Sequence, residues 1–161
     1  MRGLARIACV QSSQARRYAP WLWLLATLFI ARVIAQPLAL FLDWWFLPRF
    51  ESWHSGVLPY PALVLTQLLI AGWLVYTAWR FTRGEVDPRS RLGSWMLGIG
   101  GVYFCVMVVR LLVVGTVLSR YHRWFRSPLP TVFHLVLATY LLIFGRFHYR
   151  YGSRAPGGRT P

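Results

Sequence analysis

The stretch GSWMLGIGGVYFCVMVVRLLVVGTVL, residues 93–118, decides the fold because only one charged side chain, Arg110, interrupts its apolar run. A helix rises about 1.5 Å per residue and the hydrocarbon core of a bilayer is about 30 Å thick, so roughly 20 apolar residues can cross it. A core helix of a soluble protein would instead show a polar face at helical spacing. Residues 93–118 therefore predict a transmembrane helix.

Three further stretches of this kind predict a multi-pass membrane protein. The chain is 57% hydrophobic and 17% aromatic, which is high for a soluble domain of 161 residues. We predict an all-α polytopic membrane protein, a four-transmembrane-helix bundle within residues 20–149, whose first helix begins at Pro20. A basic segment, 1–19, precedes the bundle, and a Gly- and Pro-rich tail, 150–161, is expected to be disordered. The predicted spans cover about residues 20–42, 57–79, 93–118 and 129–147.

The distribution of charge predicts the orientation. The chain has 18 basic residues, all of them arginine, against 4 acidic ones. Four arginines fall in each of the amino-terminal segment, the connection 80–91 and the carboxyl-terminal part of the chain from Arg146, twelve together, whereas the two opposite connections hold four. Because positively charged connections stay on the cytoplasmic side, we expect both termini in the cytoplasm and the protein in a bacterial inner membrane. The same rule explains the charge without nucleic acid, for which the chain carries no recognition motif.

Five polar side chains stand out within the predicted spans, towards their outer ends. Counted inward at about 1.5 Å per residue, Arg32, Gln67 and Arg110 lie roughly 13 to 15 Å deep. Gln36 lies about 9 Å deep and His134 about 6 Å deep by the same count. An intramembrane arginine normally faces the bundle interior or a wet cavity and has a partner. These five residues are the candidate ligand-binding site, with snorkelling to the interface as the ordinary alternative.

No predicted span contains an acid that could pair with the arginines. Asp43 and Glu51 lie in the first outer connection, and Glu85 and Asp87 lie in the inner one. The arginines must then be neutralised by the first connection folding inward, by a bound anion or by another subunit. Because that connection is rich in aromatic residues that suit the membrane interface, we expect Glu51 and His54 to close the mouth of the site.

Spacing along the helices predicts which faces pack together. Small residues recur at every fourth position of the first span and would let a neighbouring helix approach closely: Thr27, Ala31, Ala35 and Ala39. Arg32 and Gln36 form the adjacent row, which would then face the bundle. Similar spacing predicts one shared face for His134, Ala138 and Gly145, and another for Gly98 and Cys105.

The sequence predicts no metal or cofactor. Glu51 and His54 have the Glu-x-x-His spacing of di-iron bundles, but such sites need a second copy and further glutamates. A single haem or metal held by His54, His122 and His134 is the minor alternative. The two cysteines form no C-x-x-C pair, so neither a disulfide framework nor a dithiol relay is expected.

Three functions are consistent with these features. The leading hypothesis is a protein that binds an amphiphile, a lipid or quinone, through its head group in an outer-leaflet pocket. Arg32 and Arg110 would hold the head, while Gln36, Gln67 and His134 would orient it. The alternatives are an accessory subunit, or a homo-oligomer, whose arginines meet carboxylates on a partner helix, and a small enzyme acting on a lipid or quinone. The chain carries no hydrolase, zinc-protease or phosphate-loop motif, so no catalytic residue is assigned.

Overall fold

The computed structural model describes residues 2–41, 60–113 and 128–152, and these contain four α-helices and no strand. The helices are α1 (Arg2–Phe41), α2 (Tyr60–Arg83), α3 (Ser90–Val113) and α5 (Pro128–Gly152). Each contains a stretch long and apolar enough to cross a membrane: Ser12–Leu38, Pro61–Arg83, Ser90–Val113 and Pro130–Gly152. Over the described residues the protein is thus an all-α membrane protein with four helices able to span a membrane, and the predicted fold class is confirmed.

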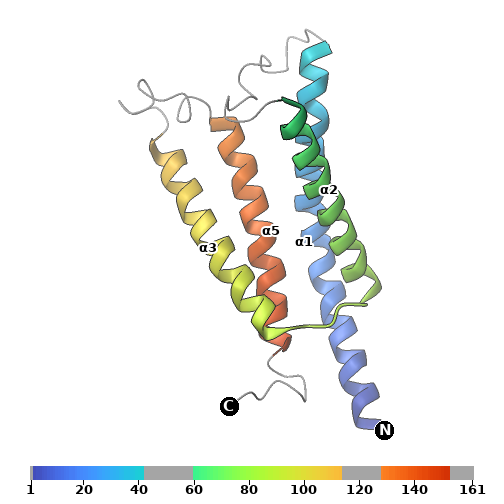
Figure 1. Ribbon diagram of the computed structural model, residues 1–161. Helices are drawn as coiled ribbons and strands as arrows, with labels where there is room; N and C mark the ends of the chain where they lie inside the picture. The colour runs from blue at the N-terminus through green and yellow to red at the C-terminus, as the bar shows by residue number, and fades with distance from the viewer. Residues whose placement is uncertain (1, 42–59, 114–127, 153–161) are drawn as a thin grey trace.

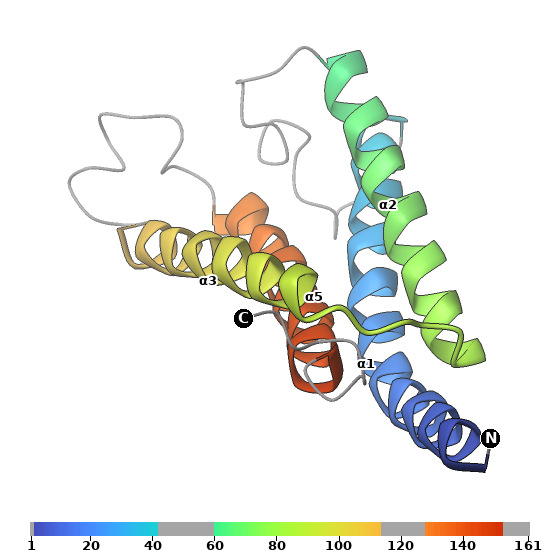
Figure 2. The same cartoon turned by 60° about the horizontal axis from the view of Figure 1, so that its bottom comes forward.

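The bundle is centred on α5. The start of α1 and the end of α5 lie at one end of the bundle, which we call the terminal end, and the opposite end is the distal end (Figure 1). In both views α5 lies between α3 and α1 (Figures 1 and 2). It packs most closely on α3 and also on α1, which in turn packs on α2. Consequently 39% of the most apolar 18-residue stretch of α5 is buried within the protein, whereas the same fraction is 17% for α3.

The core stripe of α1 follows alternate steps of four and three residues. Ala15, Ala19, Leu22, Ala26 and Phe29 are all buried, and this spacing keeps one stripe turned towards the neighbouring helices. The residues that pack against this stripe come from α2 and α5, and most of them have large side chains: Leu74, Ala78, Phe81, Tyr140, Phe144 and Phe147.

The predicted small-residue seam on α1 is wrong. Thr27 and Ala31 are exposed and Ala35 is half-buried. An α-helix has about 3.6 residues per turn, so a row with a constant step of four drifts around the helix and cannot face one neighbour along its length. The adjacent row does point inward, because Arg32 and Gln36 are both buried.

Glycines bring α3 and α5 into backbone contact. Two on each helix are buried and spaced seven residues apart, so that they share one face: Gly93, Gly100, Gly145 and Gly152. A methyl group at Gly93 would collide with the backbone of Tyr149, and one at Gly145 would lie 2.9 Å from the backbone nitrogen of Leu97. Only glycine permits an approach this close.

The two other predicted faces have opposite outcomes. Ala138 and Gly145 are buried and His134 is half-buried, which confirms the face predicted for α5. Gly98 and Cys105 are exposed, so the face predicted for α3 is wrong. The glycines of α3 that meet α5 lie elsewhere on the helix, and the presence of small residues alone does not tell which of them pack.

All four helices extend beyond their predicted limits at the terminal end, where α3 begins at Ser90 and α5 ends at Gly152. α1 begins at Arg2 and runs through Pro20, because Ala15 and Ala19 continue its core stripe. α2 continues to Arg83, where basic side chains suit the negative end of the helix dipole. It ends at Gly84, whose φ of 72° is the left-handed conformation typical of helix ends.

Candidate ligand site

The two intramembrane arginines are buried and come from different helices. Arg32 of α1 is 7% exposed and Arg110 of α3 is 4% exposed. The guanidinium carbon of Arg32 lies 5.3 Å from the ring centroid of Phe133 on α5, within cation–π range. Both arginine charges act on Tyr103 and on His134, so the two guanidinium groups lie around one tyrosine and one histidine.

Tyr103 and His134 form a hydrogen-bonded pair between α3 and α5. The Tyr103 hydroxyl and the His134 Nδ1 are 2.7 Å apart. Two nearby guanidinium charges disfavour a third positive charge on the imidazole, so we assign a neutral ring whose Nδ1 accepts the phenol proton. The proton of that ring then lies on Nε2, and His134 can donate a hydrogen bond to a further group.

A second polar contact joins α1 to α2. The side-chain nitrogen of Gln67 donates to the amide oxygen of Gln36 over 3.2 Å, and the two residues are 5% and 1% exposed. Hydrogen bonds between transmembrane helices contribute about 0.6 kcal/mol on average. A contribution of this size is too small for the packing of α1 on α2 to depend on these two buried amides.

Three buried polar atoms make no hydrogen bond with any described residue: Arg32 Nε, Gln36 Nε2 and Thr131 Oγ1. Leaving such an atom unsatisfied costs about 1 to 3 kcal/mol, and more for a charged group. Arg32 and Gln36 are one turn apart on the same face of α1, so one group of acceptor oxygens could satisfy both. Helices α3 and α5 run antiparallel, with Gly93 beside Tyr149. The same register places Thr131, at the distal end of α5, at the level of Leu111 on α3, one residue beyond Arg110.

Acidic side chains within the described part of the chain lie far from this cluster. Glu85 and Asp87 are in the connection between α2 and α3 at the terminal end, and both are exposed. Asp43 and Glu51 fall outside the described residues. Arg32 therefore has no carboxylate partner among the described side chains, and its guanidinium lies against an aromatic ring instead.

The structure brings most of the predicted site together. Arg32 and Arg110 lie near Tyr103, which bonds His134, and Gln36 meets Gln67; we call these six residues the distal cluster. Tyr103 was not predicted, although it shares a helix face with Arg110 seven residues later. Glu51, His54 and His122 lie outside the described residues, so the predictions for them stay predictions. Among the described residues, no three His, Cys, Asp or Glu side chains are grouped as a metal site.

Comparison with protein-family models, curated proteins and solved structures finds no match. What the distal cluster binds therefore has to follow from its own chemistry.

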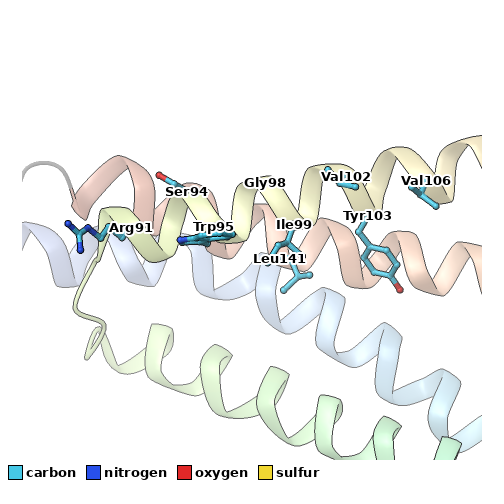
Figure 3. A pocket seen from close by; sticks show the side chains of 9 residues that line it. All are labelled: Arg91, Ser94, Trp95, Gly98, Ile99, Val102, Tyr103, Val106 and Leu141. Carbon is cyan, nitrogen blue, oxygen red and sulfur yellow. The ribbon is translucent and has the colours of Figure 1, made fainter.

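An apolar groove along α3 adjoins the distal cluster. It has a volume of about 910 Å³ and is lined mainly by α3, from Arg91 to Val106, together with Leu141 of α5 (Figure 3). Gly98 leaves it open, because a side-chain carbon there would have no neighbour within 4 Å. At about 1.5 Å per residue the lined part of α3 is about 22 Å long. Tyr103 lines the groove and also bonds His134, so the groove runs up to the polar cluster.

Proposed function

We propose that this membrane protein binds a single-tailed amphiphile, whose head carries acceptor oxygens held by the distal cluster and whose tail lies along α3. The observation that carries the proposal is the pair of buried donors on α1, Arg32 Nε and Gln36 Nε2, which no described residue satisfies. A carboxylate, phosphate or quinone oxygen would satisfy both. The Nε2–H of His134, on a half-buried side chain, is a further donor in the tautomer assigned above.

The cluster selects an acceptor rather than a donor. Guanidinium groups only donate, and the Gln36 oxygen already accepts from Gln67. The phenol proton of Tyr103 is used by His134 in the tautomer assigned above. A head whose polar atoms are hydroxyl or ammonium donors would leave the buried nitrogens unsatisfied, so we expect fatty acids or quinones to bind and neutral alcohols to be rejected.

The depth of the cluster favours an amphiphile with a single tail. Arg32 lies about 13 Å of helix below Phe41, well beneath the level at which phospholipid phosphates lie. The groove follows one helix, α3, over about 22 Å, so it has room for one extended hydrocarbon tail beside the cluster.

An accessory subunit, in which Arg32 meets a carboxylate of a partner helix, is the alternative. Burial argues against it, since Arg32 and Gln36 are 7% and 1% exposed within this chain alone. A partner helix packed on the outside would reach neither donor, whereas a narrow head group is small enough to fit between helices. From the arginine count we further propose that the terminal end faces the cytoplasm of a bacterial inner membrane.

The test is the ligand content of protein purified in mild detergent. Native mass spectrometry with analysis of extracted lipids should find one amphiphile per chain. Arg32→Gln should reduce its retention roughly 10- to 100-fold, the usual loss for a charge-assisted hydrogen bond. The matched control is Arg83→Gln, which removes an exposed arginine at the end of α2 and should leave retention unchanged.

A second variant tests the track of the tail. Gly98→Leu fills open space in the groove, so it should reduce retention while the protein stays folded. Equal ligand content in wild type, Arg32→Gln and Gly98→Leu would refute the proposal. A stoichiometric protein partner that is lost with Arg32→Gln would establish the accessory subunit instead.

A further inference from the structure

A second polar cavity lies at the terminal end of the bundle, far along the helices from the distal cluster. Its volume is about 200 Å³, and it is enclosed by the end of α2, the connection to α3, the start of α3 and the end of α5. The chemistry of its lining is carried by Arg80, Asp87, Arg89 and His148. Binding pockets for drug-sized molecules measure about 300 to 1,000 Å³, so this cavity suits one small group.

His148 is the buried polar group of this cavity. It is 4% exposed, and its ring packs against Phe81, Phe144 and Phe147 at centroid distances of 6.4, 4.4 and 5.6 Å. Its Nδ1 accepts a hydrogen bond from the backbone N–H of Arg89 over 3.2 Å. The ring proton of neutral His148 is therefore on Nε2, which makes no hydrogen bond with any described residue. Because His148 lines the cavity, this N–H is a donor without an acceptor.

The walls of the cavity are fixed by backbone hydrogen bonds. Gly84 N–H donates to the Phe81 carbonyl and Glu85 N–H to the Arg80 carbonyl, each over 3.1 Å. The Arg80 guanidinium also donates to the Glu85 carbonyl. At the other side, Gly93 N–H donates to the Arg89 carbonyl over 3.0 Å, so α3 begins immediately beside the cavity.

The first turn of α3 adds to the positive potential. The first N–H groups of a helix have no acceptor within the helix, and the N-terminal end carries about half a positive charge. Leu92, in that first turn, lines the cavity. The Nε2–H of His148 is an independent indication that an acceptor belongs there, because it comes from another helix and from a side chain that is 4% exposed.

The charges indicate which anion fits. Two arginines and one aspartate line the cavity, so with His148 neutral the net charge of the lining is +1. A phosphodiester carries one negative charge and balances this net charge, whereas a phosphate monoester carries about −1.5 to −2 at neutral pH. In a membrane protein the abundant phosphodiesters are lipid head groups, and basic pockets between transmembrane helices bind such head groups.

We propose that this cavity is a binding site for the phosphodiester head group of a phospholipid, held by Arg80, Arg89 and the Nε2–H of His148. The site is separate from the distal cluster and does not depend on the function proposed for it. It places a phospholipid against the connection that orients α3 relative to α2.

The test is a titration of the delipidated protein followed by native mass spectrometry. Phosphatidylglycerol should bind with a stoichiometry of one, and diacylglycerol, which has the same chains without the phosphate, should bind at least tenfold more weakly. Arg89→Gln should weaken phosphatidylglycerol about tenfold or more. Arg83→Gln is the matched control, since that exposed arginine lies one turn from Arg80 on α2 but outside the lining, and it should change little.

Further variants keep the outcomes distinct. His148→Gln retains an N–H donor and should keep more affinity than His148→Phe; if both variants unfold, Arg89→Gln still decides. Arg32→Gln should leave this binding intact even if it abolishes binding at the distal cluster. Equal binding of phosphatidylglycerol and diacylglycerol, or equal effects of Arg89→Gln and Arg83→Gln, would overturn the proposal. Full displacement of the lipid by equimolar inorganic phosphate would assign the cavity to a soluble anion instead.

Discussion

Replacing Gly93 by alanine should separate α3 from α5. The added methyl group would collide with the backbone of Tyr149, and backbone cannot turn aside as a flexible side chain can. Overfilling a packed contact costs about 1 to 3 kcal/mol, and a contact at the backbone lies at the upper end of that range. In the opposite direction, alanine is favoured over glycine inside a helix by about 0.5 to 1 kcal/mol. The net loss for Gly93→Ala is therefore roughly 1 to 2 kcal/mol.

Gly98→Ala is the matched control on the same helix. No atom lies within 4 Å of a side-chain carbon at Gly98, so only the helix-propensity gain of about 0.5 to 1 kcal/mol remains. Reversible unfolding in mixed micelles of mild detergent and sodium dodecyl sulfate would measure both free energies of unfolding. We expect the two variants to differ by roughly 1.5 to 3 kcal/mol with opposite signs relative to wild type. If Gly93→Ala is as stable as Gly98→Ala, α3 and α5 do not meet through these glycines.

Three further predictions test the packing and the topology. Ala26→Leu should destabilise the bundle by about 1 to 3 kcal/mol, because Ala26 is fully buried, whereas Ala31→Leu should be tolerated on its exposed position; equal effects would restore the seam predicted from spacing. Tyr140→Phe removes the hydroxyl that donates to the Leu74 carbonyl over 2.8 Å and should cost about 1 kcal/mol in the same unfolding assay, while Tyr76→Phe at an exposed position should cost nothing measurable. A single cysteine placed at Asp87 in a cysteine-free background should be shielded from an impermeant reagent in intact cells; labelling there would put the terminal end outside.

The membrane fold follows from the sequence because length and hydropathy leave few alternatives. Lipid offers the backbone no hydrogen bonds, so an apolar stretch such as 93–118 must be helical to cross it. The helix faces were less predictable, since most side chains are apolar on every side and no polar face marks the surface. Gly93 and Gly98 look alike in the sequence, but only Gly93 meets a neighbouring backbone.

The polar residues of the site were predictable because lipid excludes them, whereas apolar residues can face either lipid or a neighbouring helix. Arg32 and Gln36 are too costly to face lipid, so their burial could be inferred from composition alone. Tyr103 gave no such signal, because tyrosine is common at membrane depth and its importance comes from the contact with His134 on another helix. The cavity around His148 depends on a connection whose turn at Gly84 only the structure reveals.

The pairing of the helices also bears on how the chain assembles during synthesis. The close pairs α1–α2 and α3–α5 are each formed by helices that follow one another along the chain, whereas the contact between α1 and α5 joins opposite ends of it. Contacts between neighbouring segments close the shortest loops and so form at the lowest entropic cost. We expect two helical hairpins to leave the translocon as separate units, each already paired. The hairpin of α1 and α2 would then be in the bilayer first, with the core face of α1 exposed to lipid until α5 is inserted and packs against it.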